Sequence, residues 1–243
     1  MFKNKIITST KEIHVISEED IHLQPASKFI PQWFKDMPGD INNINESFPA
    51  SHKKLIPNSR TVKMCPSFSD VFSQGYVLVA PCDIWLSVTD KEWHWKVPNP
   101  DKFQIDIHSE EQYINHVDNN VKMVFKYVNS IRMFAPKGYS IWQMPMHHHY
   151  DINKDWYVPY GIIDIDIHHE VNPQIFYISD SDEVLIKKGT PLCYYVPFKR
   201  DDAKIKFEMK PYTKELEKKD IISSLKTFSR FKRGYTHKRK DNR

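Results

Sequence analysis

Residues 158–200 decide the fold class, and they read VPYGIIDIDIHHEVNPQIFYISDSDEVLIKKGTPLCYYVPFKR. Within them, GIIDIDIH alternates apolar and polar residues, as an extended strand does when successive side chains point to opposite faces. The two faces are expected to carry Ile163, Ile165 and Ile167 on one side, and Asp164, Asp166 and His168 on the other. The acidic face is either the solvated side of a half-buried strand or part of a binding site.

The stretches before this segment are short, mixed in polarity and interrupted by Pro, Asn or Asp. GYVLVAPCDIWLSV at 75–88 and KEWHWKV at 91–97 are rich in β-branched and aromatic residues, which predicts strands. FQIDIHSEEQYINH at 103–116 and VKMVFKYVNSIRMFAP at 121–136 have the same texture. Short strands separated by turn residues indicate an antiparallel β sandwich or barrel rather than a helical protein.

The chain divides by composition into four parts. Residues 1–60 are rich in Pro and aromatic residues and predict an irregular segment packed on the body, and residues 61–210 predict the β domain. Residues 211–233 predict one C-terminal helix, which Thr213 caps and which carries Glu215 and Glu217 in its first turns. Residues 234–243 form a basic tail.

Composition limits the function. The 243 residues include 6 glycines and 16 prolines, and the sequence has neither GxGxxG nor GxxxxGK[ST], so no glycine-rich phosphate loop is expected. The three cysteines are widely spaced, which argues against a disulfide framework and fits a reducing cytoplasm, that of the host cell if the chain is encoded by a phage. The first residues lack an apolar signal-peptide core, and the apolar runs are too short for a membrane span, so a cytoplasmic protein is expected.

The net charge of +4 is concentrated at the C-terminus. Residues 226–243 hold eight basic residues and one acidic residue, so the rest of the chain is mildly acidic. The tail either contacts nucleic acid or another anionic surface without sequence readout, or is a solvated terminus.

Two resemblances follow from the quoted stretch. GIIDIDIHHE followed by DEVLIKKGTPLCYYVPF, with APKGYSIWQMP upstream, resembles the closing half of the dUTPase and dCTP-deaminase fold over residues 135–199. The chain as a whole also resembles an uncharacterised family of tailed-phage and bacterial proteins. The first resemblance implies a mainly β fold, a dUTPase-like β-clip or a related jelly-roll barrel, and it implies nucleotide binding. The C-terminal helix predicted from residues 211–233 follows this β domain.

The hydrolytic set of a dUTPase is incomplete in this chain. Asp164 occupies the position of the aspartate that orients the attacking water in a dUTPase, but Ile167 stands where the family has an aromatic residue under the sugar. The Arg-Ser-Gly phosphate segment is replaced by Met146, His147 and His148, and the glycine-rich C-terminal arm is absent. The resemblance therefore supports a dUTPase-like fold more strongly than it supports dUTP hydrolysis.

The candidate ligand-binding residues are polar groups on predicted strands. Asp106 and His108 repeat the Ile-Asp-Ile-His string of residues 165–168, and they would meet the acidic face if the two strands were neighbours. Carboxylates side by side shift each other's pKa, which is typical of sites. The predicted ligand-binding set is Asp164, Asp166, His168, Gln143, Asp106 and His108.

The three consecutive histidines at 147–149 suggest a metal site, because imidazoles are preferred ligands of zinc and iron. His147 and His149 would share a strand face, and His168 would complete a set with a carboxylate. The alternative is a group of histidines in a surface loop or in core hydrogen bonds.

Three functions fit these residues. The first is a small-ligand binding protein, with a nucleotide as a candidate ligand, that keeps a dUTPase-like cup without the full hydrolytic set. The second is a His-rich metal-dependent β-barrel enzyme with a divalent cofactor, and the third is a phage structural or host-interaction protein. The sequence leaves open whether a reaction is catalysed, and exposed strand edges predict a homo-oligomer without membrane contact.

Overall fold

The computed structural model describes residues 2–8, 11–17, 23–40, 60–89, 92–113, 120–146, 148–200, 209 and 211–228. The chain forms two units, Met1–Arg200 and Asp201–Arg243, which are described separately. The basic tail at 234–243 and His147 lie outside the described residues.

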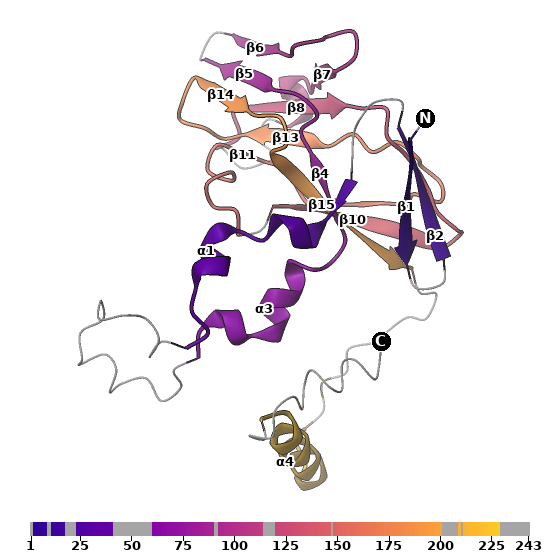
Figure 1. The fold of residues 1–243 in the computed structure, drawn as a ribbon, viewed down its shortest axis with the longest axis vertical. Helices are drawn as coiled ribbons and strands as arrows, with labels where there is room; N and C mark the ends of the chain where they lie inside the picture. Colours follow the sequence, from indigo (N-terminus) through magenta and orange to yellow (C-terminus); the bar gives the residue numbers. More distant parts are fainter. Residues whose placement is uncertain are drawn as a thin grey trace, which may run out of the picture. The chain divides into compact units, whose positions relative to one another are not determined.

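The first unit is built from short strands (Figure 1). The strands up to the middle of the chain are β1 (Phe2–Thr8), β2 (Lys11–Ser17), β3 (Leu23–Pro25), β4 (Tyr76–Val79), β5 (Ile84–Val88), β6 (Trp93–Lys96), β7 (Gln104–Ile107) and β8 (Met123–Val128). The later strands are β9 (Arg132–Phe134), β10 (Tyr139–Pro145), β11 (Trp156–Tyr157), β12 (Gly161–Ile163), β13 (Gln174–Tyr177), β14 (Glu183–Ile186) and β15 (Pro191–Lys199).

All described strand pairs are antiparallel, and they form four sheets. The largest has the order β12-β10-β15-β4-β3, and the others are β11-β13-β8-β7, β1-β2-β9 and β14-β5-β6. Neighbours such as β10 and β15 are far apart in sequence, so the chain crosses between sheets repeatedly. No sheet closes into a barrel within the described strands.

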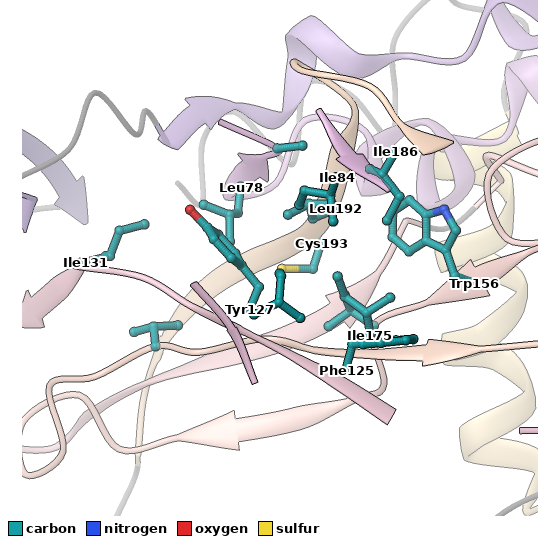
Figure 2. Packing of buried hydrophobic residues seen from close by; sticks show 14 of the residues in the cluster. Leu78, Ile84, Phe125, Tyr127, Ile131, Trp156, Ile175, Ile186, Leu192 and Cys193 are labelled. Carbon is teal, nitrogen blue, oxygen red and sulfur yellow. The ribbon is translucent and has the colours of Figure 1, made fainter. Parts of the chain in front are cut away.

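One apolar cluster lies between the sheets. Figure 2 shows part of it, with Leu78 from β4, Phe125 and Tyr127 from β8, Ile175 from β13 and Cys193 from β15. Each of these side chains is fully or almost fully buried. The cluster therefore holds strands from different sheets against one another.

The first unit also contains short helices. They are η1 (Ala26–Phe29), α1 (Gln32–Asp36), η3 (Val62–Met64), α3 (Pro66–Val71) and η4 (Glu110–Gln112). Figure 1 shows α1 beside α3, and Phe34 of α1 packs on Phe68 and Phe72 with ring centroids 5.8 and 4.7 Å apart. Ala26 of η1 packs on Val77 of β4.

The second unit contains α4 (Lys214–Phe228). Thr213 caps it as predicted, because the Thr213 hydroxyl accepts a hydrogen bond from the Leu216 N–H at 3.3 Å. Both the C-terminal helix and the mainly β class expected from the sequence are confirmed.

The first 60 residues differ from the expected irregular segment, because β1 and β2 pair along their whole length there. No helix among the described residues is long and apolar enough to cross a membrane. All three cysteines are free, with Cys82 and Cys193 buried and Cys65 exposed. Burial raises the pKa of the Cys193 thiol to about 12, which makes it an unreactive core residue.

Candidate functional site

The acidic strand predicted at 161–168 is a strand only as far as Ile163. The chain then turns, and the carbonyl of Asp164 accepts hydrogen bonds from the N–H groups of Ile167 and His168 at 2.9 and 2.8 Å. Ile165 is buried whereas Ile167 is 74% exposed. The predicted alternation of faces is therefore wrong beyond Ile163. In a strand successive side chains point to opposite faces, and the turn at residues 164–168 does not keep this alternation.

The turn brings Asp164 and Asp166 onto one arginine. Arg200, directly after β15, donates from Nη1 to Asp164 at 2.6 Å and from Nη2 to Asp166 at 2.5 Å. The Ser140 hydroxyl of β10 donates to Asp164 at 2.6 Å, and the Gly138 N–H donates to Asp166 at 2.7 Å. We refer to these five residues as the Arg200 cluster.

These contacts lower the pKa of both carboxyls. For Asp164 the main cause is the Ser140 hydrogen bond, followed by the Arg200 hydrogen bond. For Asp166 the main cause is Arg200, followed by the Gly138 N–H. Both carboxylates are therefore ionised, and the Arg200 guanidinium that bonds to both balances one of their two negative charges.

Asp106 and His108 belong to another sheet. Asp106 lies on β7, which pairs with β8, whereas Asp164 follows β12, which pairs with β10. Asp106 is exposed, and its carboxylate accepts a hydrogen bond from the Ile107 N–H at 2.9 Å. The polar patch that the repeated Ile-Asp-Ile-His string would make between neighbouring strands is therefore not formed.

Gln143 of β10 is buried, with 7% of its surface exposed. Its amide nitrogen donates to the Pro159 carbonyl at 3.2 Å, and its amide oxygen accepts from the Tyr195 hydroxyl at 3.4 Å. Both the amide nitrogen and the amide oxygen of Gln143 make hydrogen bonds within the protein. Gln143 therefore links Tyr195 of β15 to the segment before β12.

The histidines predicted to bind metal lie in separate turns. His149 is half-buried in the segment after β10, and His168 is exposed in the turn after β12. Within the described ranges, which omit His147, no three His, Cys, Asp or Glu side chains gather closely enough to hold a metal ion. The metal site stays a prediction from the sequence.

A cavity of about 740 Å³ lies beside His149. Its lining comes from the η1–α1 segment, from the turn after β10 and from the start of β15, and includes Phe29, Trp33, His149, Tyr150, Asp151 and Pro191. We refer to it as the Trp33 cavity. The rings of Trp33 and Tyr150 lie 5.8 Å apart at an interplanar angle of 31°, and Tyr150 is 65% exposed.

The turn that carries Tyr150 is held from several sides. The Trp33 indole N–H donates to the His148 carbonyl at 2.7 Å, and the Asn153 amide donates to the Met146 carbonyl at 2.7 Å. His148 has φ 63°, a conformation that a non-glycine residue keeps only when its surroundings impose it. Its imidazole packs on Phe68 at 4.4 Å, which supplies that constraint.

His149 is a neutral hydrogen-bonding group in this lining. Burial lowers the pKa of its imidazole, and this outweighs the Phe29 carbonyl, which raises the pKa by accepting a hydrogen bond from it. Its Nε2 is buried and has no hydrogen-bond partner in the described part of the chain. The cavity thus combines a ring pair, a neutral imidazole and the carboxylate of Asp151.

Comparisons with known proteins give a distant likeness. No protein-family model and no curated protein matches the chain. Among solved structures, native EIAV dUTPase is 12% identical with a TM-score of 0.34, over 58% of this chain and 85% of that one. A mutant dUTPase from phage phi11 of S. aureus is 11% identical with a TM-score of 0.33, over 58% of this chain and 86% of that one.

The sequence alone did not identify Arg200 and Ser140 of the Arg200 cluster, or Trp33 and Tyr150 of the Trp33 cavity. Arg200 follows Lys199 at the end of a predicted strand, and Ser140 lies within APKGYSIWQMP, but neither residue was assigned a role there. Trp33 lies in the segment of residues 1–60 that is expected to pack on the β domain. Tyr150 directly follows the three histidines and has no predicted role. The Pro- and aromatic-rich composition near Trp33 was the one sequence feature that could have pointed to this cavity. It does not predict that the Trp33 ring lies beside Tyr150.

Proposed function

We propose that the protein binds a small ligand with a flat aromatic ring, of the nucleobase class, in the Trp33 cavity. The observation that carries the proposal is the exposed Tyr150 ring, inclined at 31° to Trp33 at the wall of a cavity of about 740 Å³. Small-molecule sites typically occupy about 300–1,000 Å³ and combine apolar walls with a few polar groups.

The chemistry of the lining suits a base in particular. Stacking of a base on an aromatic side chain contributes about 1–3 kcal/mol, and any base has a face that can stack. His149 and Asp151 lie next to Tyr150 in the lining, and Asp151 offers a carboxylate to the polar edge of a ring. The resemblance of residues 135–199 to dUTPases supports a nucleoside or nucleotide as the ring-bearing ligand.

Hydrolysis of dUTP is not part of the proposal. Asp164, at the position of the water-orienting aspartate of dUTPases, accepts hydrogen bonds from Ser140 and Arg200. A carboxylate held in this way is a poor base because its proton affinity is low. We infer a binding role for the chain and assign no catalytic residue.

The first experiment is a thermal melt of the full chain against nucleosides and nucleotides of each base. A ligand at a hundredfold excess over its Kd adds about 2.7 kcal/mol to the free energy of unfolding, which raises the melting temperature visibly. Tyr150→Ala is expected to weaken binding about tenfold, because it removes one stacking surface.

The matched control is Tyr160→Ala, since Tyr160 is 61% exposed and does not line the cavity. Tyr160→Ala should leave the affinity unchanged. A flat response of the wild-type protein across the panel, or an equal loss in both variants, would refute the proposal and favour a structural or assembly role.

A further inference from the structure

The Trp33 cavity has one full charge among its described lining residues, the carboxylate of Asp151. The other described lining side chains are apolar, aromatic or uncharged, since burial lowers the pKa of His149 and keeps its imidazole neutral. No Lys or Arg stands among the described lining residues to neutralise the carboxylate. The negative charge of Asp151 therefore acts on a ligand that occupies the cavity.

The Asp151 carboxylate is free to accept hydrogen bonds. Neither a hydrogen bond nor an ion pair joins it to another residue in the part of the chain that the structure describes. Burial lowers the pKa of the neighbouring His149 imidazole, and the negative charge of Asp151 partly opposes this effect. The carboxylate therefore lies close to the side chain of a second lining residue.

The turn that carries Asp151 also fixes its position relative to Tyr150. The carbonyl of His149 accepts hydrogen bonds from the N–H groups of Ile152 and Asn153 at 3.0 and 3.1 Å, and these bonds close the turn around Tyr150 and Asp151. The ring on which a base can stack and the carboxylate that meets the polar edge of that base are thus adjacent in one closed turn.

A carboxylate favours a ligand edge that presents two neighbouring donors. Its oxygens accept hydrogen bonds and cannot donate, so the pairing is strongest when two N–H groups lie side by side and each bonds to one oxygen. Guanine has such an edge, since its N1–H and its exocyclic N2–H point in the same direction. Uracil has one N–H between two carbonyl oxygens, and adenine and cytosine have a ring acceptor beside the amino group. Those acceptors repel a carboxylate.

We propose that the Trp33 cavity binds guanine nucleosides in preference to nucleosides of the other bases, an inference that rests on the proposed function of this cavity. The guanine ring lies on the Tyr150 ring, and its N1–H and N2–H donate to the two oxygens of Asp151. Stacking accepts any base, so the carboxylate supplies the preference. This preference differs from that of a dUTPase, whose ligand contains uracil.

The test is isothermal titration calorimetry of the full chain with guanosine, inosine, 1-methylguanosine, adenosine, cytidine and uridine. Inosine lacks the N2 amino group and 1-methylguanosine lacks the N1–H, so each keeps the purine ring and loses one of the two donors. We expect guanosine to bind about tenfold more tightly than any of the others, because a bidentate pair discriminates between bases to this extent. Equal affinities for guanosine, inosine and uridine would overturn the inference.

Asp151→Asn tests the carboxylate itself. An asparagine amide keeps one acceptor and replaces the other oxygen with a donor. We expect this variant to bind guanosine about tenfold more weakly and uridine with unchanged affinity. Asp101→Asn is the matched control and should bind guanosine like the wild-type protein, because Asp101 is exposed and lies outside the lining. A preference for guanosine that persists in Asp151→Asn would also overturn the inference.

The outcomes separate this inference from the proposed function. Equal binding of all nucleosides, weakened alike by Tyr150→Ala, would support the proposed ligand site and overturn the preference for guanine. If no nucleoside binds, the proposed function is refuted and the preference with it. A thermal melt of Asp151→Asn that matches the wild-type melt shows that the variant is folded, so a loss of guanosine affinity then reports on the carboxylate.

Discussion

At the scale of single residues, Arg200 determines what Asp164 and Asp166 can do. Two carboxylates close together repel, and one of them would take up a proton more readily if no cation were present. The Arg200 guanidinium bonds to both, so the pKa of each carboxyl is lowered instead. The pair therefore joins the turn after β12 to the end of β15.

This ion pairing makes stability depend on acid pH. A carboxyl whose pKa is lower in the folded state stabilises the fold above its unfolded pKa of about 3.9, and that contribution is lost as pH falls through the folded pKa. Arg200→Gln should lower stability near neutral pH and flatten the loss of stability between about pH 5 and pH 2. Urea denaturation across this range measures both effects.

Arg132→Gln serves as the control for removing one arginine, since Arg132 pairs with the half-exposed Glu170 at 3.0 Å. A pH dependence of Arg200→Gln as steep as that of the wild-type protein would show that the cluster does not set acid stability.

At the scale of elements, the approach to β4 requires a glycine. Gly75 has φ +72° directly before the strand, and a Cβ there would lie 2.3 Å from the Tyr195 carbonyl oxygen of β15. Gly189, in the turn before β15, has φ +84° with open space around it. Both glycines have a left-handed backbone conformation, but only Gly189 has space for a Cβ atom.

This difference predicts two sizes of destabilisation. Gly189→Ala should cost about 1–2 kcal/mol, the strain of an L residue in the left-handed region. Gly75→Ala should cost about 3 kcal/mol or more, because β15 must also move away from β4. Urea denaturation of both variants measures the difference, and equal losses would contradict the close approach of Gly75 to β15.

At the scale of the whole molecule, one apolar cluster joins all four sheets of the first unit. It contains Ile13 from β2, Leu78 from β4, Ile84 from β5 and Ile175 from β13. Residues far apart in sequence thus depend on the same packing. The sheets are expected to unfold together rather than one by one.

Matched leucines test the importance of this cluster. Leu78 is fully buried and Leu185 of β14 is 51% exposed. Leu78→Ala should cost about 2–5 kcal/mol through lost packing and the cavity left behind. Leu185→Ala should change stability by about 0.5 kcal/mol or less, as exposed substitutions usually do. Coincident fluorescence and circular dichroism melts of Leu78→Ala would confirm joint unfolding, and separated transitions would argue against it.

The sequence by itself determined the mainly β class, the C-terminal helix and its Thr213 cap. These features depend on local patterns, such as alternation, β-branched content and a capping residue within one turn of its acceptor.

Only the tertiary structure decided how the candidate residues are grouped. Alternation predicts a strand as long as backbone pairing continues, but β12 ends at Ile163, and its continuation turns to meet Arg200. Trp33 meets Tyr150 because α1 and the turn after β10 are packed together, a contact that no local pattern encodes. Ion pairs and cavities arise from long-range packing, and periodicity along the chain reports only the burial of each face.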